Sequence, residues 1–144
     1  MQFYRSRFSA AALLSTFKIT SVFSNYVPQH GADTIRTLYV AHQARGILTI
    51  GFDPTKPANS SLSIIDTSVK GGYLPQWLHL HGDKLYSVSR AHYPTANDES
   101  GGVFAFDRQK NGSLSLLNSV PSSGLGAVYV DVSPDGRTLS APNM

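Results

Sequence analysis

The sequence predicts an all-β protein in which four-stranded antiparallel sheets repeat as the blades of a β-propeller. Strand-like segments recur at intervals of about 50 residues, which is the period expected for such blades. Turn residues separate these segments. The composition, with 41% hydrophobic and 15% charged residues, suits one domain that buries a core. We therefore expect about two complete blades and the first hairpin of a third.

The repeat is visible when the chain is aligned with itself. Ser61–Asp66 returns 52 residues later as Ser113–Asn118, and both segments combine serine with branched apolar residues. Trp77–Leu80 returns as Tyr129–Val132 after the same interval. Equal spacing at independent positions indicates that one structural unit is repeated along the chain.

The strands of each blade follow from alternating aromatic and branched residues. The first blade is expected over 36–70, the second over 76–120, and an incomplete third over 127–141. The second blade is the clearest, with strands predicted at Trp77–His81, Leu85–Ser89, Val103–Phe106 and Leu114–Val120.

Short turns join neighbouring strands and make them antiparallel. Asn111-Gly112 and Asp135-Gly136 are dipeptides that supply the positive φ angles of tight hairpins. We therefore predict a positive φ at Gly136. The longer loop Ala91–Ser100 accounts for unequal spacing between some repeated segments.

The amino-terminal segment 1–24 has the layout of a targeting peptide. Arg5 and Arg7 precede the apolar run Phe8–Leu14, and a tract of small residues follows. A secretory signal with cleavage near Asn25 is the first interpretation. A mitochondrial transit peptide and an untargeted cytoplasmic N-terminus remain alternatives. Residues 25–35 are expected to be a linker, and 36–144 the partial propeller.

Charge and cysteine content exclude several functions. The net charge of +3 comes from basic residues in the first 18 positions, so the predicted propeller carries no basic patch for nucleic acid. The absence of cysteine excludes disulfides and thiol nucleophiles. No apolar run reaches the roughly 20 residues of a membrane-spanning helix. We expect neither nucleic acid nor membrane as a partner.

Four segments resemble the lactonase family of seven-bladed propellers, and its fungal branch in particular. They are Leu38–Ala41, Gly102–Asp107, Gly112–Val120 and Val130–Leu139. The resemblance, to 6-phosphogluconolactonase and carboxy-cis,cis-muconate cyclase, implies opening or closing of a lactone ring without metal or other cofactor. It also implies His, Arg and Glu side chains at the mouth of a central channel.

The chain departs from the family where an innermost strand begins. The family repeats Gly-Pro-x-His there, whereas this sequence has Gly126-Ala127-Val128-Tyr129. A phenol is a weaker base than an imidazole at neutral pH. We therefore assign no catalytic residue. We predict Tyr129 as a substrate-binding residue, together with Arg90 and His92, which follow the predicted strand Leu85–Ser89. For Arg90 and His92 the alternative is a solvated surface loop.

Two histidines on one strand have a second interpretation. His79 and His81 share a face at i and i+2, as a pair of metal ligands would. No third ligand is specified, so we predict ordinary half-buried positions and no metal. Trp77, Tyr86 and Phe104 are expected to pack between blades.

The resemblance predicts a lactone-ring hydrolase or cycloisomerase that acts on sugar-acid lactones or muconates. We expect this chain to be an incomplete and inactive part of such an enzyme, with exposed blade faces that self-associate. The alternative is a non-catalytic propeller scaffold that binds protein or glycan partners.

Overall fold

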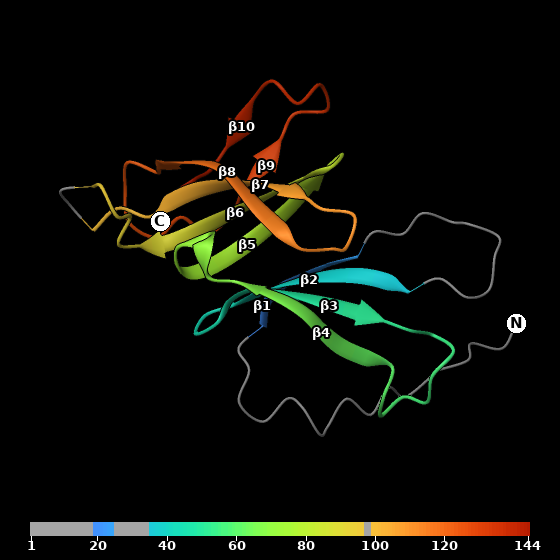
Figure 1. The fold of residues 1–144 in the computed structure, drawn as a ribbon. Helices are drawn as coiled ribbons and strands as arrows, with labels where there is room; N and C mark the ends of the chain where they lie inside the picture. Colours follow the sequence, from blue (N-terminus) through green and yellow to red (C-terminus); the bar gives the residue numbers. More distant parts are fainter. Residues whose placement is uncertain (1–18, 25–34, 97–98) are drawn as a thin grey trace, which may run out of the picture.

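The structure is a computed structural model, and it describes residues 19–24, 35–96 and 99–144. These residues form three antiparallel sheets with no α-helix among them (Figure 1). No helix in the described ranges has the length and apolar character needed to cross a membrane. Residues 1–18 of the predicted leader and 25–34 of the predicted linker lie outside the description.

The first sheet contains four strands in sequence order. They are β1 (Ile19–Ser24), β2 (Arg36–His42), β3 (Gly46–Phe52) and β4 (Leu62–Ser68). The segment predicted as a leader thus contributes a strand to this sheet, since β1 pairs antiparallel with β2. The pairing of β3 with β4 contains a bulge, because Thr49 pairs with Asp66 and Ile50 with Ile64. Ile65 is the extra residue of β4 at this bulge.

The second sheet is the most regular blade. A short 3₁₀ turn, η1 (Val69–Gly71), leads into its strands, β5 (Tyr73–His81), β6 (Lys84–Ala91), β7 (Gly102–Arg108) and β8 (Leu114–Pro121). Their order in the sheet is their order in the chain. All four strands predicted for this blade are confirmed, and each extends beyond the predicted bounds at one end or both.

The third sheet is a short hairpin of β9 (Asp131–Val132) and β10 (Leu139–Ser140). Gly136 in its turn has a φ of 71°, which confirms the prediction of a positive angle. The strands are shorter than expected. Outside the regular ladder, the Val128 amide donates a hydrogen bond of 3.4 Å to the Pro142 carbonyl.

The first interface joins the first and second sheets through a buried apolar cluster. Alternation along each strand turns one set of side chains toward the facing sheet. The cluster comprises Tyr39, Ala41, Ile47, Leu78, Leu85, Phe104 and Phe106.

A carbonyl at the edge of the second sheet reinforces this interface. The Gly112 carbonyl oxygen accepts hydrogen bonds from the hydroxyls of Tyr39, at 3.1 Å, and Thr49, at 3.2 Å. Gly112 can turn this carbonyl inward because it adopts a φ of 88°. Burial raises the pKa of the Tyr39 phenol, while the nearby Arg108 charge partly opposes that shift.

The second interface joins the other face of the second sheet to the third hairpin. It buries Val88, Val103, Ala127 and Val130, with Trp77, Tyr86 and Ala141 packed against them. Trp77, Tyr86 and Phe104 therefore pack between sheets, as predicted. Since β5 contacts β1 and also β9, the first strands of successive sheets lie beside one another, as innermost strands of a propeller do (Figure 1).

Candidate functional site

Arg90 and His92 lie at one end of the second sheet, where β6 finishes. The segment that leads to Tyr129 is attached at the same end, because the Gly126 amide donates a hydrogen bond of 2.9 Å to the Arg90 carbonyl. The structure therefore brings the three predicted substrate-binding residues to neighbouring segments of chain.

Arg90 is exposed and shares a face of β6 with Val88. Val88 belongs to the second interface, so the Arg90 guanidinium lies on the side of the sheet that faces the third hairpin. A guanidinium in this position can bind a carboxylate or a phosphate through paired hydrogen bonds.

His92 follows β6 directly and is held in a constrained conformation. Its φ is 55°, which is uncommon for a residue with a side chain. Its ring meets the edge of the Tyr73 ring with centroids 4.8 Å apart. We call Tyr73, Arg90 and His92 the strand-end group.

Tyr129 is oriented differently from the other two predicted residues. Its ring packs against Trp77, with centroids 5.0 Å apart and planes tilted by 50°. Among the described residues, no hydrogen bond or ring contact joins the Tyr129 side chain to Arg90 or His92. The predicted site is therefore divided between the strand-end group and the inner strands.

A polar contact that sequence reasoning missed also joins β5 to the third hairpin. The His79 Nδ1 atom is 3.3 Å from Oδ1 of Asp131, which links the second sheet to the third hairpin. The same Asp131 oxygen accepts a hydrogen bond from the Val132 amide, at 2.9 Å. We call Trp77, His79, Tyr129 and Asp131 the inner-strand cluster.

The repeat in the sequence indicates the equivalent strand positions of these four residues, but not which of their side chains meet. Trp77 and His79 share a face of β5, and Tyr129 and Asp131 occupy the equivalent repeat positions 52 residues later. The structure pairs His79 with Asp131 instead of directing it, together with His81, toward a common ligand. Within the described ranges, no three His, Asp or Glu side chains are grouped as metal ligands.

His81 contacts the turn of the third hairpin. A side chain at Gly136 would come within 3.1 Å of its Nε2 atom. In the same turn, the hydroxyl of Ser133 and then the backbone amide of Arg137 hydrogen bond to Asp135 and lower the pKa of its carboxyl. This carboxylate thus completes the turn.

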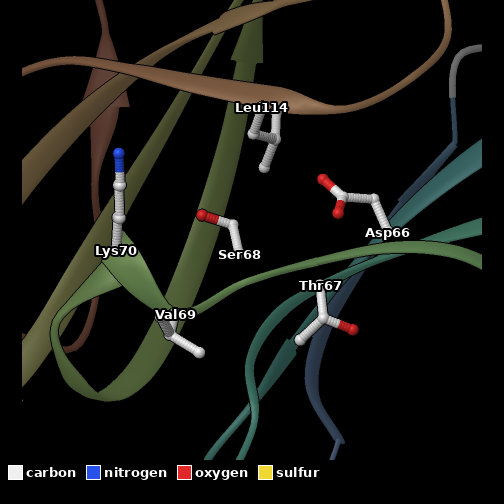
Figure 2. Close-up of a pocket in the computed structure, with 6 residues that line it drawn as sticks. All are labelled: Asp66, Thr67, Ser68, Val69, Lys70 and Leu114. Atoms are coloured by element: carbon white, nitrogen blue, oxygen red, sulfur yellow. The ribbon is translucent and has the colours of Figure 1, made fainter.

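A pocket of about 240 Å³ lies elsewhere, between the outer strands of the first two sheets. Figure 2 shows Asp66, Ser68 and Lys70 on the side of the pocket that faces Leu114, with Thr67 and Val69 turned away. None of the predicted site residues lines it. Since it is lined by β4, η1 and β8 only, we regard it as a gap at the edge of the first interface.

Comparison with known proteins agrees with this architecture. The family model described as "Lactonase, 7-bladed beta-propeller" matches residues 34–143. No curated protein and no solved structure shows significant similarity to the chain. The match spans most of the sequence and includes the strand-end group and the inner-strand cluster, and the family is associated with lactone-related hydrolysis. The chain belongs to the lactonase family of seven-bladed β-propellers.

Proposed function

We propose that this chain forms part of the substrate-binding wall of a lactone-ring hydrolase or cycloisomerase. The substrates would be sugar-acid lactones or muconates. The observation that carries the proposal is the hydrogen bond between Gly126 and Arg90, which holds the strand-end group beside the start of the next innermost segment. Family membership supplies the reaction class.

The strand-end group suits the polar end of such a substrate. Arg90 would pair with the carboxylate or phosphate that these molecules carry, and the exposed His92 ring would hydrogen bond to the lactone. A cation near the lactone carbonyl also stabilises the negative charge that develops when water attacks it. These residues therefore bind and polarise the substrate.

The same residues do not form a complete site for proton transfer. Tyr129 occupies the position where the family repeats a histidine, and a phenol accepts a proton poorly at neutral pH. The only glutamate in the sequence is Glu99, in the loop that follows His92. We propose that the chain by itself binds the substrate and does not accelerate ring opening.

Calorimetric titration of the full chain with 6-phosphogluconate, the ring-opened product, tests the binding proposal. Arg90→Gln should weaken binding by about tenfold or more, because one charge-assisted contact is lost. Arg45→Gln, in the turn between β2 and β3, is the matched control and should bind as the wild type does. Equal affinities of wild type and Arg90→Gln would reject the proposed role of Arg90.

Hydrolysis assays test the second part of the proposal. The chain should open 6-phosphogluconolactone, and convert carboxymuconate, no faster than buffer does. Turnover that Arg90→Gln abolishes would reject the inactive-chain proposal while supporting the site.

The substitution of tyrosine for histidine also favours a second candidate, a non-catalytic scaffold that binds protein or glycan. Failure of the folded chain to bind 6-phosphogluconate, 6-phosphogluconolactone and carboxymuconate would favour this candidate over the lactonase site.

A further inference from the structure

Two Asn-X-Ser sequons occur in the sequence, and they repeat with the blades. Asn59-Ser60-Ser61 lies in the loop between β3 and β4, and Asn111-Gly112-Ser113 lies in the turn between β7 and β8. The two asparagines are 52 residues apart, which is the interval of the strand repeat. Each therefore lies three residues before the outermost strand of its sheet begins.

Both asparagine side chains are open to solvent. Asn59 belongs to a stretch, 54–60, in which every residue is exposed, and Asn111 is exposed in its turn. The amide and the hydroxyl of Ser113 donate hydrogen bonds of 3.1 Å and 2.8 Å to Oδ1 of Asn111, which leaves its Nδ2 atom unused. Within the described part of the chain, the Nδ2 atom of Asn59 makes no hydrogen bond either. A substituent on either nitrogen would therefore displace no contact.

The strands that follow the sequons are edges with little protection of their own. β4 and β8 end the first and second sheets, so one side of each keeps unpaired backbone groups. Exposed apolar side chains lie on both strands, Leu62 and Ile64 on β4 and Leu117 and Val120 on β8. Lysine, which commonly protects edge strands, occurs in neither strand. Their composition alone thus favours pairing with another chain.

We infer that Asn59 and Asn111 are acceptor sites for N-linked glycans, which shield the outer edges of the two blades. A glycan is bulky and solubilising. Attached at the turn before an edge strand, it hinders the approach of a second chain to that strand. The secretory interpretation of the leader supplies the compartment for this modification. The inference does not depend on the proposed lactone site.

The modification needs only an oligosaccharide donor and the asparagine amide. The donor is an oligosaccharide linked to a lipid through a diphosphate. A bond forms between Nδ2 of the asparagine and the first sugar carbon, while the bond from that carbon to the diphosphate breaks. The lipid diphosphate leaves, and the amide nitrogen releases one proton to solvent. The serine hydroxyl of the sequon is needed during transfer, whereas the folded chain must leave room only at the asparagine.

The full chain, secreted from yeast behind an added signal sequence, tests the inference without relying on its own leader. Intact-mass spectrometry should find two N-linked glycans on the wild type, one on Asn59→Gln, one on Asn111→Gln and none on the double variant. Asn118→Gln, which changes an exposed asparagine outside any sequon, should keep both glycans. Translation with microsomes gives the same count as gel shifts if a variant does not fold. Absence of a glycan from either asparagine of the wild type would overturn the inference.

The shielding role has a separate readout. Endoglycosidase H trims each glycan to a single N-acetylglucosamine, and sedimentation velocity should then shift toward larger species. The double variant from the same cells should self-associate in the same way. Trimmed protein that sediments as a monomer, as the glycosylated protein does, would contradict the shielding of these edges.

Discussion

The first and second interfaces cover the two faces of the same sheet, and they differ in how far they extend across it. At the first interface, β8 contributes Leu114 and Leu116, which pack against the buried cluster. Val120, whose partner Val103 belongs to the second interface, is 52% exposed, and Leu117, at the bulge in β8, is 53% exposed. The first sheet has four strands to cover its neighbour, whereas the third sheet has two (Figure 1).

This difference shows what the outer strands of a propeller blade contribute. The two strands of the third hairpin suffice to bury Val88 and Val103 near the axis. They do not reach the edge of the second sheet, so its outermost apolar side chains stay in water. Full burial of a leucine or valine side chain stabilises a fold by about 1.5–3 kcal/mol. Each exposed side chain at this edge therefore contributes less than that to the stability of the fold. Five predictions sharpen this comparison.

The largest effect is expected in the centre of the first interface. Phe106→Ala should lower the free energy of unfolding by about 3–5 kcal/mol, because Phe106 is fully buried and its loss leaves a cavity. Val130→Ala, in the second interface, should cost clearly less, because it removes fewer buried atoms from a smaller cluster. Urea unfolding monitored by circular dichroism measures both. An equal or larger loss for Val130→Ala would show that the short hairpin stabilises the molecule as strongly as a full sheet does.

The turn of the third hairpin should be the next most sensitive position. Gly136→Val should cost about 1 kcal/mol or more, because a branched residue is strained at a φ of 71° and approaches His81. Thr138→Val in the same hairpin is the control. Faster amide hydrogen exchange confined to residues 131–140 would locate the damage. Unchanged exchange would mean that the turn does not hold the hairpin in place.

A smaller effect is expected at the hydrogen bond that reinforces the first interface. Tyr39→Phe should cost about 1 kcal/mol at neutral pH, because Gly112 keeps its second donor, Thr49. Tyr86→Phe is the matched change in the second interface, measured by the same urea unfolding. A Tyr39→Phe protein as stable as the wild type would show that the Thr49 bond alone suffices.

The pH dependence gives Tyr39 a second test. Its folded pKa is raised by burial, so the phenol favours folding while it is neutral, below the ordinary tyrosine pKa of about 10. That stability is lost as pH rises from there through the raised folded pKa. The wild type should therefore lose more stability than Tyr39→Phe above about pH 10. Parallel pH profiles for the two proteins would contradict the assignment.

The smallest effect on stability is expected at the uncovered edge of the second sheet. The double change Leu117→Lys with Val120→Lys should alter the free energy of unfolding by no more than about 0.5 kcal/mol, because both residues are half exposed. It should instead reduce self-association, observed by sedimentation velocity, since it removes an apolar patch. Ser115→Lys on the same strand controls for added charge. Equal self-association in both variants would exclude this face as the contact.

Much of the fold could be predicted because propeller blades are built from local patterns. Alternation predicts that Leu85 and Phe106 turn inward, and both are fully buried. The Asp-Gly dipeptide predicts the conformation of Gly136 without knowledge of any other part of the molecule. Alternating apolar residues and turn dipeptides also located the four strands of the second sheet.

Contacts between blades could not be predicted in this way. The Tyr39–Gly112 hydrogen bond and the His79–Asp131 pair join residues from different sheets. Which side chains meet there depends on how one sheet slides and tilts over the next, and the period of the repeat does not specify this offset. For the same reason the sequence predicted Arg90, His92 and Tyr129 together, whereas the Tyr129 ring turns toward Trp77.

Strand β1 completes the first sheet and lies in a segment where cleavage would change that sheet. It pairs with β2 through positions such as Val22 with Val40, and it lies within the segment that has the layout of a targeting peptide. A protease that cut after Ser24 would leave β2 as the edge of a three-stranded sheet, with a row of unpaired backbone groups. Such an edge accepts an added strand from any chain of suitable shape. Loss of β1 would thus expose the backbone groups of β2 that now pair with it.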